Sequence, residues 1–494
     1  MQTPEATTPQ GCAALRAAVK SRRWRPLHSC VGTARPVPFP TCPKCSRYGP
    51  TNVPVGEALR LLVFLFCAAL LVLGQFGRTF EDSERYGYLT DIMPSDWAAT
   101  NVWLASSACA LERGVWLAVC EKGKLVPISE RAIADDPGHA LLLDLWSMAT
   151  RSRATLPDVA RLNTLLDALG LLALAGLLFS LRAWLTSIVL MWLGPVEYVG
   201  WMGTSPHWSY IGLVSMSAVL PITLAAKDLG LLSRRVGNLW IAAGLLFLAL
   251  ATLARESIGI MGLLVSFGVM AVLVARRPHR RQRIQPLLLA GVLALAAFTT
   301  PRWVVLARDA AFDMQPAQRL ATHGLSHTLY LGLGFVENKW GIRYDDDYGQ
   351  EIADKADPPV VFGSPDYFRL MGTLYRARWA EDPLEVSRIY AAKAWRLLAV
   401  PTLYPGPPFG IVLLIGLIHL AAATALGAWR RIGFRQGFVI EGVALCFLGL
   451  FLAQAMAALP SQTYALPANA FVLVLLGAIV EFFVRAVLRI KAAW

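Results

Sequence analysis

The segment Leu239–Ala275 reads LWIAAGLLFLALATLARESIGIMGLLVSFGVMAVLVA, two apolar runs separated only by Arg255-Glu256-Ser257. A helix needs about 20 mostly apolar residues to cross the ~30 Å hydrocarbon core of a bilayer. Extended to 236–254 and 257–275, each run approaches this length, and the polar turn between them is very short. The segment therefore predicts two consecutive membrane-spanning helices.

The rest of the 494 residues has the same character. Hydrophobic residues make up 56% of the chain and charged residues only 16%, which excludes one large water-soluble enzyme and a disordered chain. We predict an all-α integral membrane protein with about ten transmembrane helices. The approximate spans are 57–77, 162–181, 184–203, 208–226, 236–254, 257–275, 285–305, 409–428, 436–457 and 467–485.

The distribution of charge predicts the orientation. The 46 Lys and Arg residues against 33 Asp and Glu give a net charge of +13, and in membrane proteins the basic excess collects in cytoplasmic loops. With a cytoplasmic N-terminus every predicted inside segment is basic, as at Arg276-Arg277, while Glu81-Asp82 and Asp345-Asp346-Asp347 fall outside. We therefore predict membrane lipids as partners and no nucleic acid.

This topology divides the chain into four parts. Residues 1–56 are predicted to be a disordered basic cytoplasmic tail, and 57–305 a transmembrane core that includes a large outer loop, 78–161. Residues 306–408 form an extracytoplasmic loop domain, and 409–494 the last transmembrane helices with a basic cytoplasmic end. The first apolar run is predicted to stay uncleaved, because no small-x-small cleavage site follows it.

The loop domain contains two predicted amphipathic helices. Ser364-Pro365-Asp366 and Asp382-Pro383-Leu384-Glu385 each place a capping residue before a proline at the first helical position. Apolar residues follow both signals at helical spacing. The apolar faces of these helices rest either on the membrane interface or on each other.

Cysteines leave two questions open. Cys42-Pro-Lys-Cys45 in the tail is a weak zinc or redox signal beside the simpler interpretation of an unstructured segment. In the first outer loop, Cys109 and Cys120 either form a disulfide, which that compartment permits, or stay reduced.

Charged residues gather near the outer ends of different spans. Glu81-Asp82 follows the first span, and adjacent helical residues point about 100° apart, so we expect one of the two to face inward. A carboxylate there is either a general base toward an acceptor hydroxyl or a solvated helix end. Asp167 and Glu197, toward the outer ends of their spans, are candidates for lining the same outward cavity.

Arg255 lies in the turn between two apolar spans. An arginine at that depth costs free energy unless it is paired, and a guanidinium binds phosphate or carboxylate in a bidentate manner. Arg255 therefore either holds an anionic group of a substrate or makes an internal pair with Glu256 or Asp167.

The segment 302–347 contains two histidines, His323 and His327, at i and i+4. On a helix they share a face and are candidates for a metal site, a substrate contact or a structural role. The HExxH arrangement is lacking, and the three consecutive aspartates at 345–347 lack the spacing of an EF-hand loop. We predict no certain cofactor, and a divalent metal stays an open alternative.

Taken together, the arrangement resembles the GT-C glycosyltransferases, which include protein mannosyltransferases and lipid A aminoarabinose transferases. The resemblance rests on an acidic pair after the first helix, a large first outer loop, the Arg255-Glu256 turn, a later outer loop domain, and Tyr464-Ala-Leu-Pro467 entering the last span. It covers most of residues 57–485.

The resemblance implies transfer of a sugar, with inversion, from a polyprenyl-phosphate donor to a glycan, lipid or protein acceptor on the extracytoplasmic face of a bacterial inner membrane. Asp82, or its neighbour Glu81, would be the base. Positive charge stabilises a phosphate leaving group, so the expected donor-phosphate residues are Arg255 and, as weaker candidates, Arg302, Arg308 and Lys339. The expected substrate contacts are Glu256, His323, His327 and Tyr464.

Two other functions fit a chain of this kind. A polysaccharide polymerase or ligase also has many spans and a large outer loop, but uses diphosphate-linked donors. A lipid-linked sugar flippase or transporter predicts polar groups near the bilayer midplane and interrupted helices. Here the charged residues cluster at the outer ends of the spans, which favours a transferase.

Overall fold

The computed structural model describes residues 55–86, 98–130, 137–195, 206–276, 281–314, 324–401, 406–458, 460 and 466–491. Within these ranges the chain is mainly helical, with a two-stranded antiparallel sheet of β1 (Ala118–Glu121) and β2 (Lys124–Pro127). The predicted all-α fold is confirmed. The predicted tail lies almost wholly outside the described residues, as do Cys42, Cys45 and Glu197.

Seven described helices are long and apolar enough to cross a membrane, so the chain is a multi-pass membrane protein. Two predicted spans, 184–203 and 409–428, coincide with shorter apolar helices, α6 (Trp184–Leu193) and α16 (Phe409–Ala425). The count of ten therefore stays a prediction. The seven are α2 (Val55–Tyr86), α5 (Leu156–Ser180), α7 (Tyr210–Asp228), α8 (Arg234–Ala254), α9 (Glu256–Ala275), α18 (Arg435–Ala457) and α20 (Ala468–Lys491).

A bent pair of helices raises the number of candidate spans to eight if the pair is counted as one span. The helices α10 (Arg281–Phe298) and α11 (Thr300–Phe312) meet at an angle of 51° inside the predicted span 285–305. Pro301, in the first turn of α11, has no backbone N–H and cannot continue the hydrogen-bond ladder of α10. The missing hydrogen bond at Pro301 weakens the helix at the point where it bends.

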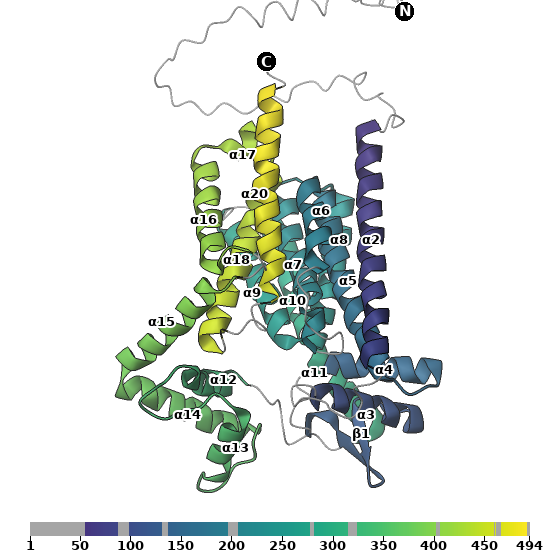
Figure 1. Cartoon of the computed structure of the whole chain (residues 1–494), viewed down its shortest axis with the longest axis vertical. Helices are drawn as coiled ribbons and strands as arrows, with labels where there is room; N and C mark the ends of the chain where they lie inside the picture. The colour runs from purple at the N-terminus through teal and green to yellow at the C-terminus, as the bar shows by residue number, and fades with distance from the viewer. Residues whose placement is uncertain are drawn as a thin grey trace, which may run out of the picture. The chain divides into compact units, whose positions relative to one another are not determined.

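Two loop regions lie at one end of the helix bundle, which we call the loop end (Figure 1). The first consists of α3 (Ala98–Arg113), the hairpin, η2 (Ile128–Glu130) and α4 (Pro137–Thr150). The second consists of α12 (Leu325–Leu331), η5 (Gly332–Phe335), α13 (Asp346–Asp354), α14 (Pro365–Glu381) and α15 (Pro383–Ala399).

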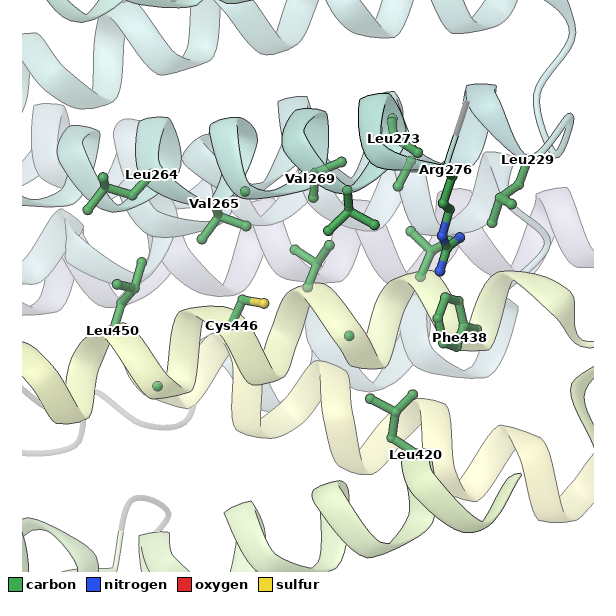
Figure 2. Close-up of a pocket in the computed structure, with 17 residues that line it drawn as sticks. Leu229, Leu264, Val265, Val269, Leu273, Arg276, Leu420, Phe438, Cys446 and Leu450 are labelled. Carbon is green, nitrogen blue, oxygen red and sulfur yellow. The ribbon is translucent and has the colours of Figure 1, made fainter. Parts of the chain in front are cut away.

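Backbone contacts fix the position of both regions. Gly138 of α4 packs on Leu253 at the carboxyl end of α8, and Lys393 of α15 donates to the carbonyl of Ala457 at the carboxyl end of α18. Figure 2 shows Leu264 of α9 facing Leu450 of α18, so these helix ends lie at the same end of the bundle.

The opposite end, which we call the basic end, carries arginines. Arg60 and Arg485 both lie over the ring of Trp184, and Arg485 also lies over Phe434. Arg276 follows directly after α9 at this end. The short helix α17 (Ala428–Arg431) adds two more arginines. Arginines that are far apart in the sequence therefore lie together at this end of the bundle.

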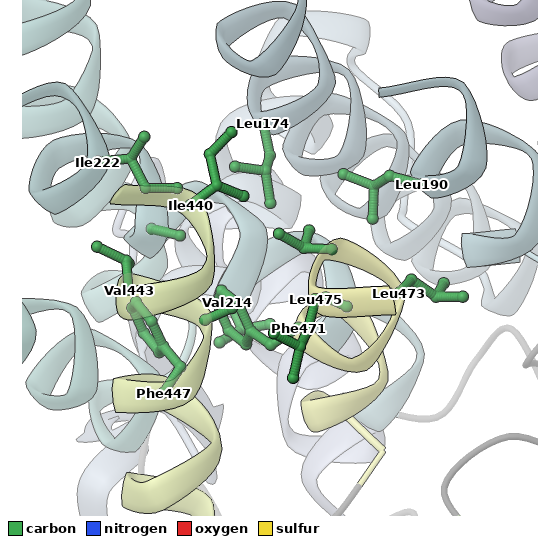
Figure 3. Close-up of a cluster of buried hydrophobic side chains, with 14 of the residues drawn as sticks. Leu174, Leu190, Val214, Ile222, Ile440, Val443, Phe447, Phe471, Leu473 and Leu475 are labelled. Atoms are coloured by element: carbon green, nitrogen blue, oxygen red, sulfur yellow. The ribbon is translucent and has the colours of Figure 1, made fainter. Parts of the chain in front are cut away.

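The core lies between α5, α7, α18 and α20. Leu174, Val214, Phe447 and Phe471 meet there (Figure 3), and the rings of Phe447 and Phe471 stack with centroids 4.2 Å apart. The apolar window of α7 is 89% buried, whereas that of α2 is 11% buried. A helix that is apolar all round and buried all round is central, so α7 is the centre of the bundle and α2 lies at its periphery.

A disulfide between Cys109 and Cys120 holds the first loop region together, with Cα atoms 5.3 Å apart. It joins the end of α3 to strand β1. Of the two alternatives that the sequence left open for these cysteines, the structure therefore has the disulfide.

The second loop region contains the two predicted amphipathic helices. The Ser364 hydroxyl accepts from the N–H of Tyr367 at the start of α14, and the Asp382 carboxylate accepts from the N–H of Glu385 at the start of α15. Their apolar faces join one core with α12 and η5, and the hydroxyls of Tyr375 and Tyr390 bond to each other. Of the alternatives for these faces, the helices pack on each other.

Candidate functional site

A cluster of buried polar side chains lies at the loop end, where several spans end. Burying this many polar groups costs free energy unless they bond to one another, and such clusters mark functional sites in membrane proteins. It is therefore the first candidate for a site. We call it the polar cluster; its buried members are Gln75 of α2, His139 of α4, Asn163 and Asp167 of α5 and Ser209 of η4 (Pro206–Ser209), and the half-buried Arg255 between α8 and α9 completes it.

Asp167 connects three spans. Its Oδ2 accepts from the side-chain amide of Gln75 at 2.9 Å, and its Oδ1 accepts from the backbone N–H of Gly212 at 2.7 Å. This contact requires glycine, because a Cβ on Gly170 would lie 1.9 Å from the carbonyl oxygen of Gly212. The carboxylate is thus held where the backbones of α5 and α7 touch.

His139 is buried and bonds to Asn163, which lies one helical turn before Asp167 in α5. Its Nε2 lies 3.3 Å from the Ser209 hydroxyl, and its ring stacks on Trp103 with centroids 4.5 Å apart. Burial and, to a smaller extent, the nearby charge of Arg255 together lower the pKa of His139 to about 4. The imidazole is therefore neutral at pH 7 and able to accept or donate a hydrogen bond.

Gly138 allows the backbone of α4 to approach the polar cluster closely. A Cβ at this position would lie 2.5 Å from the carbonyl oxygen of Leu253. Only glycine permits this approach of α4 to the end of α8. The neighbouring His139 is thereby brought next to the turn that carries Arg255.

Arg255 supplies positive charge to the cluster. Its backbone N–H donates to Ala251 at 2.7 Å, and its carbonyl accepts from Ile258 and Gly259, each at 3.1 Å, so one residue ends α8 and begins α9. The guanidinium lies 5.5 Å from the ring centroid of Tyr210. A partly buried guanidinium at this place would stabilise an anion at the mouth of the cluster.

Glu81 and Asp82 belong to the last two turns of α2. The helix continues without a break beyond the membrane-spanning part, Gly56–Gly77. Asp82 follows Gln75 by two turns, so its Cα lies on the same side of α2 and ~10 Å further along the axis. One continuous helix therefore joins the backbone of the acidic pair to Gln75 of the polar cluster. The catalytic role of Glu81 and Asp82 stays a prediction.

The weaker phosphate candidates lie elsewhere. Arg308 of α11 is buried, donates to the carbonyl of Leu117 at 2.8 Å and pairs with Asp309 at 2.6 Å, which ties α11 to the first loop region. Lys339 pairs with Asp382 at 2.8 Å on the surface of the second loop region. Arg302 is exposed in the first turn of α11.

His327 takes part in a different polar chain. Its Nδ1 lies 2.7 Å from the Tyr367 hydroxyl, and its Nε2 lies 3.2 Å from an oxygen of Asp346. Burial raises the pKa of Tyr367. These contacts join α12, α13 and α14. The contacts of His327 therefore hold the helices of the second loop region together.

The three other predicted substrate contacts are His323, Tyr464 and Glu256. His323 and Tyr464 lie outside the described residues, so the paired arrangement with His327 is not tested. Glu256 is the first residue of α9 and is exposed. Among the described residues, no group of three or more His, Cys, Asp or Glu side chains is placed to hold a metal ion.

Sequence reasoning missed His139, Asn163 and Asp144. Asp144 lies five residues after His139 in α4, and its Oδ2 accepts from the Ser106 hydroxyl at 2.9 Å and from the N–H of Leu117 at 2.7 Å. Burial raises its pKa to about 7. The available signal was a histidine and an aspartate in the otherwise apolar stretch from Pro137 to Trp146.

Comparison with known proteins gave one structural relative of interest. No family model matches the sequence, and no curated protein matches it. Among solved structures, the chain is similar to ArnT from Cupriavidus metallidurans in the apo state, with 13% sequence identity, a TM-score of 0.32, and coverage of 85% of this chain and 77% of that chain.

Proposed function

We propose that the chain is a membrane glycosyltransferase that moves a sugar from a polyprenyl-phosphate donor to an envelope glycan, lipid or protein, with inversion at the anomeric carbon. One observation carries the proposal. Gln75, on the helix that bears Glu81 and Asp82, bonds to Asp167 of α5, and one helical turn away Asn163 of the same helix bonds to His139, whose pKa responds to the charge of Arg255.

The reaction needs a base and a cation on opposite sides of the sugar. Asp82, or Glu81, takes the proton of the acceptor hydroxyl. The acceptor oxygen then attacks the anomeric carbon while the bond from that carbon to the donor phosphate breaks. The departing polyprenyl phosphate takes the electron pair, and Arg255 stabilises its negative charge. No nucleotide is required.

The neutral ring of His139 and the amide of Asn163 would serve as hydrogen-bonding groups beside that phosphate. Both are buried, and Asn163 bonds to His139. A neutral imidazole can donate to a phosphate oxygen without adding a charge that must later be released. These two residues extend the predicted site beyond the ones that the sequence indicated.

The disulfide supports the predicted sidedness. Disulfides persist in oxidising compartments and are rare in the cytosol, and Cys109–Cys120 lies at the loop end together with the polar cluster. The basic end lies opposite, as expected for a cytoplasmic face. We accordingly propose a bacterial inner membrane, with the reaction on its extracytoplasmic side.

The experiment that tests the function has two stages. Deletion of the gene, followed by composition analysis of envelope glycans and lipids, identifies the missing sugar. Membranes containing the Asp82→Asn, Glu81→Gln or double variant are then assayed for transfer of that sugar from its polyprenyl-phosphate form. We expect a loss of at least about 100-fold in Asp82→Asn or in the double variant.

The control is Asp347→Asn, an exposed acid of α13 outside the polar cluster. It should retain wild-type transfer at equal protein amounts. If the double variant Glu81→Gln/Asp82→Asn also turns over at the wild-type rate, the acidic pair is not the base. An unchanged envelope after gene deletion would count against the whole reaction.

A transporter of lipid-linked sugars is the second candidate, because one observation favours it. The partly buried His419 of α16 and the fully buried Glu441 of α18 form a pair at 2.8 Å among the apolar helices. Ionisable pairs within spans often belong to transport paths. Loss of sugar movement across vesicles in Glu441→Gln, with transfer unaffected, would favour transport.

A further inference from the structure

A groove of about 460 Å³ runs between α9 and α18 in the membrane-spanning part of the bundle (Figure 2). Its size lies within the ~300–1,000 Å³ of ligand cavities in proteins. Residues of α7 and α16 complete its walls, and the lining is apolar apart from the thiol of Cys446 and the guanidinium of Arg276. It lies away from the polar cluster, which occupies the loop end.

Glycines keep the groove open. Gly268 on α9 and Gly442 and Gly449 on α18 all line it, and a Cβ added at any of the three would meet no atom within 4 Å. Gly442 and Gly449 are seven residues apart and share a face of α18. Small residues in spans usually allow a second helix to approach closely, but here the space beside them is not filled by a described helix.

Arg276 marks one end of the groove. It is the first residue after α9, is exposed, and makes no ion pair with another described residue. Figure 2 shows its guanidinium directed into the groove near Phe438. An arginine at the end of a span lies at the level of the lipid headgroups, where it binds phosphate in a bidentate manner.

We propose that this groove binds an anionic phospholipid, with an acyl chain along the apolar walls and the headgroup phosphate on Arg276. Basic pockets between transmembrane helices are suited to anionic headgroups. Arg276 lies ~30 Å from Arg255 along α9, so the lipid belongs to the leaflet at the basic end. A second copy of this chain would bring its own arginines next to Arg276, and like charges would repel.

The experiment measures lipid retention on the purified full chain after delipidation in detergent, by native mass spectrometry. Phosphatidylglycerol and phosphatidylcholine with identical acyl chains are added at equal concentration. We expect phosphatidylglycerol to be retained more strongly, and Arg276→Gln to reduce its retention about fivefold without changing that of phosphatidylcholine. Gly442→Leu, which fills the groove, should reduce the retention of both lipids.

Matched controls separate the groove from general effects. Arg235→Gln removes an exposed charge at the basic end, and Gly56→Leu adds the same side chain at an open position of α2; neither residue lines the groove. Both variants should bind lipid like the wild type. Equal retention of phosphatidylglycerol by wild type and Arg276→Gln would overturn the proposal.

Two other occupants give distinct results, and either would also overturn it. If Gly442→Leu converts a dimer to a monomer while lipid retention is unchanged, the groove is an interface between two copies. If undecaprenyl phosphate is retained through Arg276 and phosphatidylglycerol is not, the ligand is a polyprenyl lipid. Cys446, which lines the groove, provides an independent readout, because bound lipid should slow its labelling by a maleimide.

Discussion

At the residue scale, two buried groups of α4 should respond to pH with opposite sign. The pKa of His139 is lowered to about 4, so below its ordinary value of 6.5 the unfolded chain takes up a proton that the folded chain does not. Its contribution to stability falls as the pH drops from 6.5 to 4, by up to about 3 kcal/mol. The pKa of Asp144 is raised from 3.8 to about 7, so the folded chain keeps that proton and its contribution falls as the pH rises from 4 to 7.

Single variants should separate the effects of His139 and Asp144 on the change of stability with pH. In Asp144→Asn, the free energy of unfolding should rise between pH 4.5 and 6.5, because the His139 contribution remains. In His139→Gln it should fall over the same range, because the Asp144 contribution remains. Denaturant unfolding of the purified proteins measures both, and parallel pH profiles in the two variants would contradict the assignment.

Arg255 gives a second prediction at this scale. Arg255→Gln should raise the KM for the polyprenyl-phosphate donor by about tenfold or more and leave the KM for the acceptor nearly unchanged, because a charge-assisted contact to phosphate is lost. Arg255→Lys should recover only part of the loss, since an ammonium group is not bidentate. Arg235→Gln, at an exposed position of α8 at the basic end, is the control. Equal donor KM values in Arg255→Gln and wild type would remove Arg255 from the donor site.

How far single residues could be predicted depended on their local context. Arg255 is conspicuous in the sequence because it interrupts a long apolar run. His139 was missed, because its partners Ser209 and Arg255 are distant in sequence and its burial depends on Gly138 meeting α8. Arg308 was recognised as a cation, but its partners Leu117 and Asp309 could be identified only from the packing of α11 on the first loop region.

At the element scale, the contact between α5 and α7 is the most sensitive packing. A Cβ at Gly212 would lie 2.3 Å from the Cα of Asp167, so Gly212→Ala must move the two backbones apart and weaken the bond from Gly212 to Asp167. We expect a loss of about 2 kcal/mol or more in stability together with loss of transfer activity. Gly268→Ala, where a Cβ meets nothing within 4 Å, should cost little. Similar melting temperatures for both variants would contradict this account.

The disulfide supports a second prediction at this scale. Cys109 and Cys120 close a short loop, and removal of such a cross-link typically costs about 2–4 kcal/mol. The double variant Cys109→Ser/Cys120→Ser should therefore loosen the first loop region and increase its cleavage by proteases, while the spans stay folded. Cys67→Ser, at a free cysteine in α2, is the control. Equal cleavage of wild type and double variant would show that the disulfide contributes little.

Elements with local signals were predicted well. The caps at Ser364 and Asp382 are confirmed, because the capping residue, the proline and the following apolar spacing all lie within one short segment. The bend between α10 and α11 was not predicted, although Pro301 is visible. A single proline in a long apolar run is also compatible with a straight span, so its effect depends on neighbouring helices.

At the scale of the whole molecule, the sequence predicted the class of fold but not the packing order. The spans share a similar apolar composition, so nothing in the sequence marks α7 as central and α2 as peripheral. Charge patterning was more informative. Basic residues lie at one end of the bundle, and the two loop regions lie at the other. This separation was predictable because basic loops stay on the cytoplasmic side of a membrane.

Sidedness is the last prediction, because the donor chemistry depends on it. In a variant that retains only Cys109 and Cys120, single cysteines are placed at Lys355, exposed in the second loop region, and at Arg234, exposed at the basic end. A membrane-impermeant maleimide added to intact spheroplasts should label Lys355→Cys and spare Arg234→Cys, and both should be labelled after permeabilisation. The reverse pattern would place Arg255 and the end of α2 in the cytosol, where a donor presented on the extracytoplasmic face could not reach them.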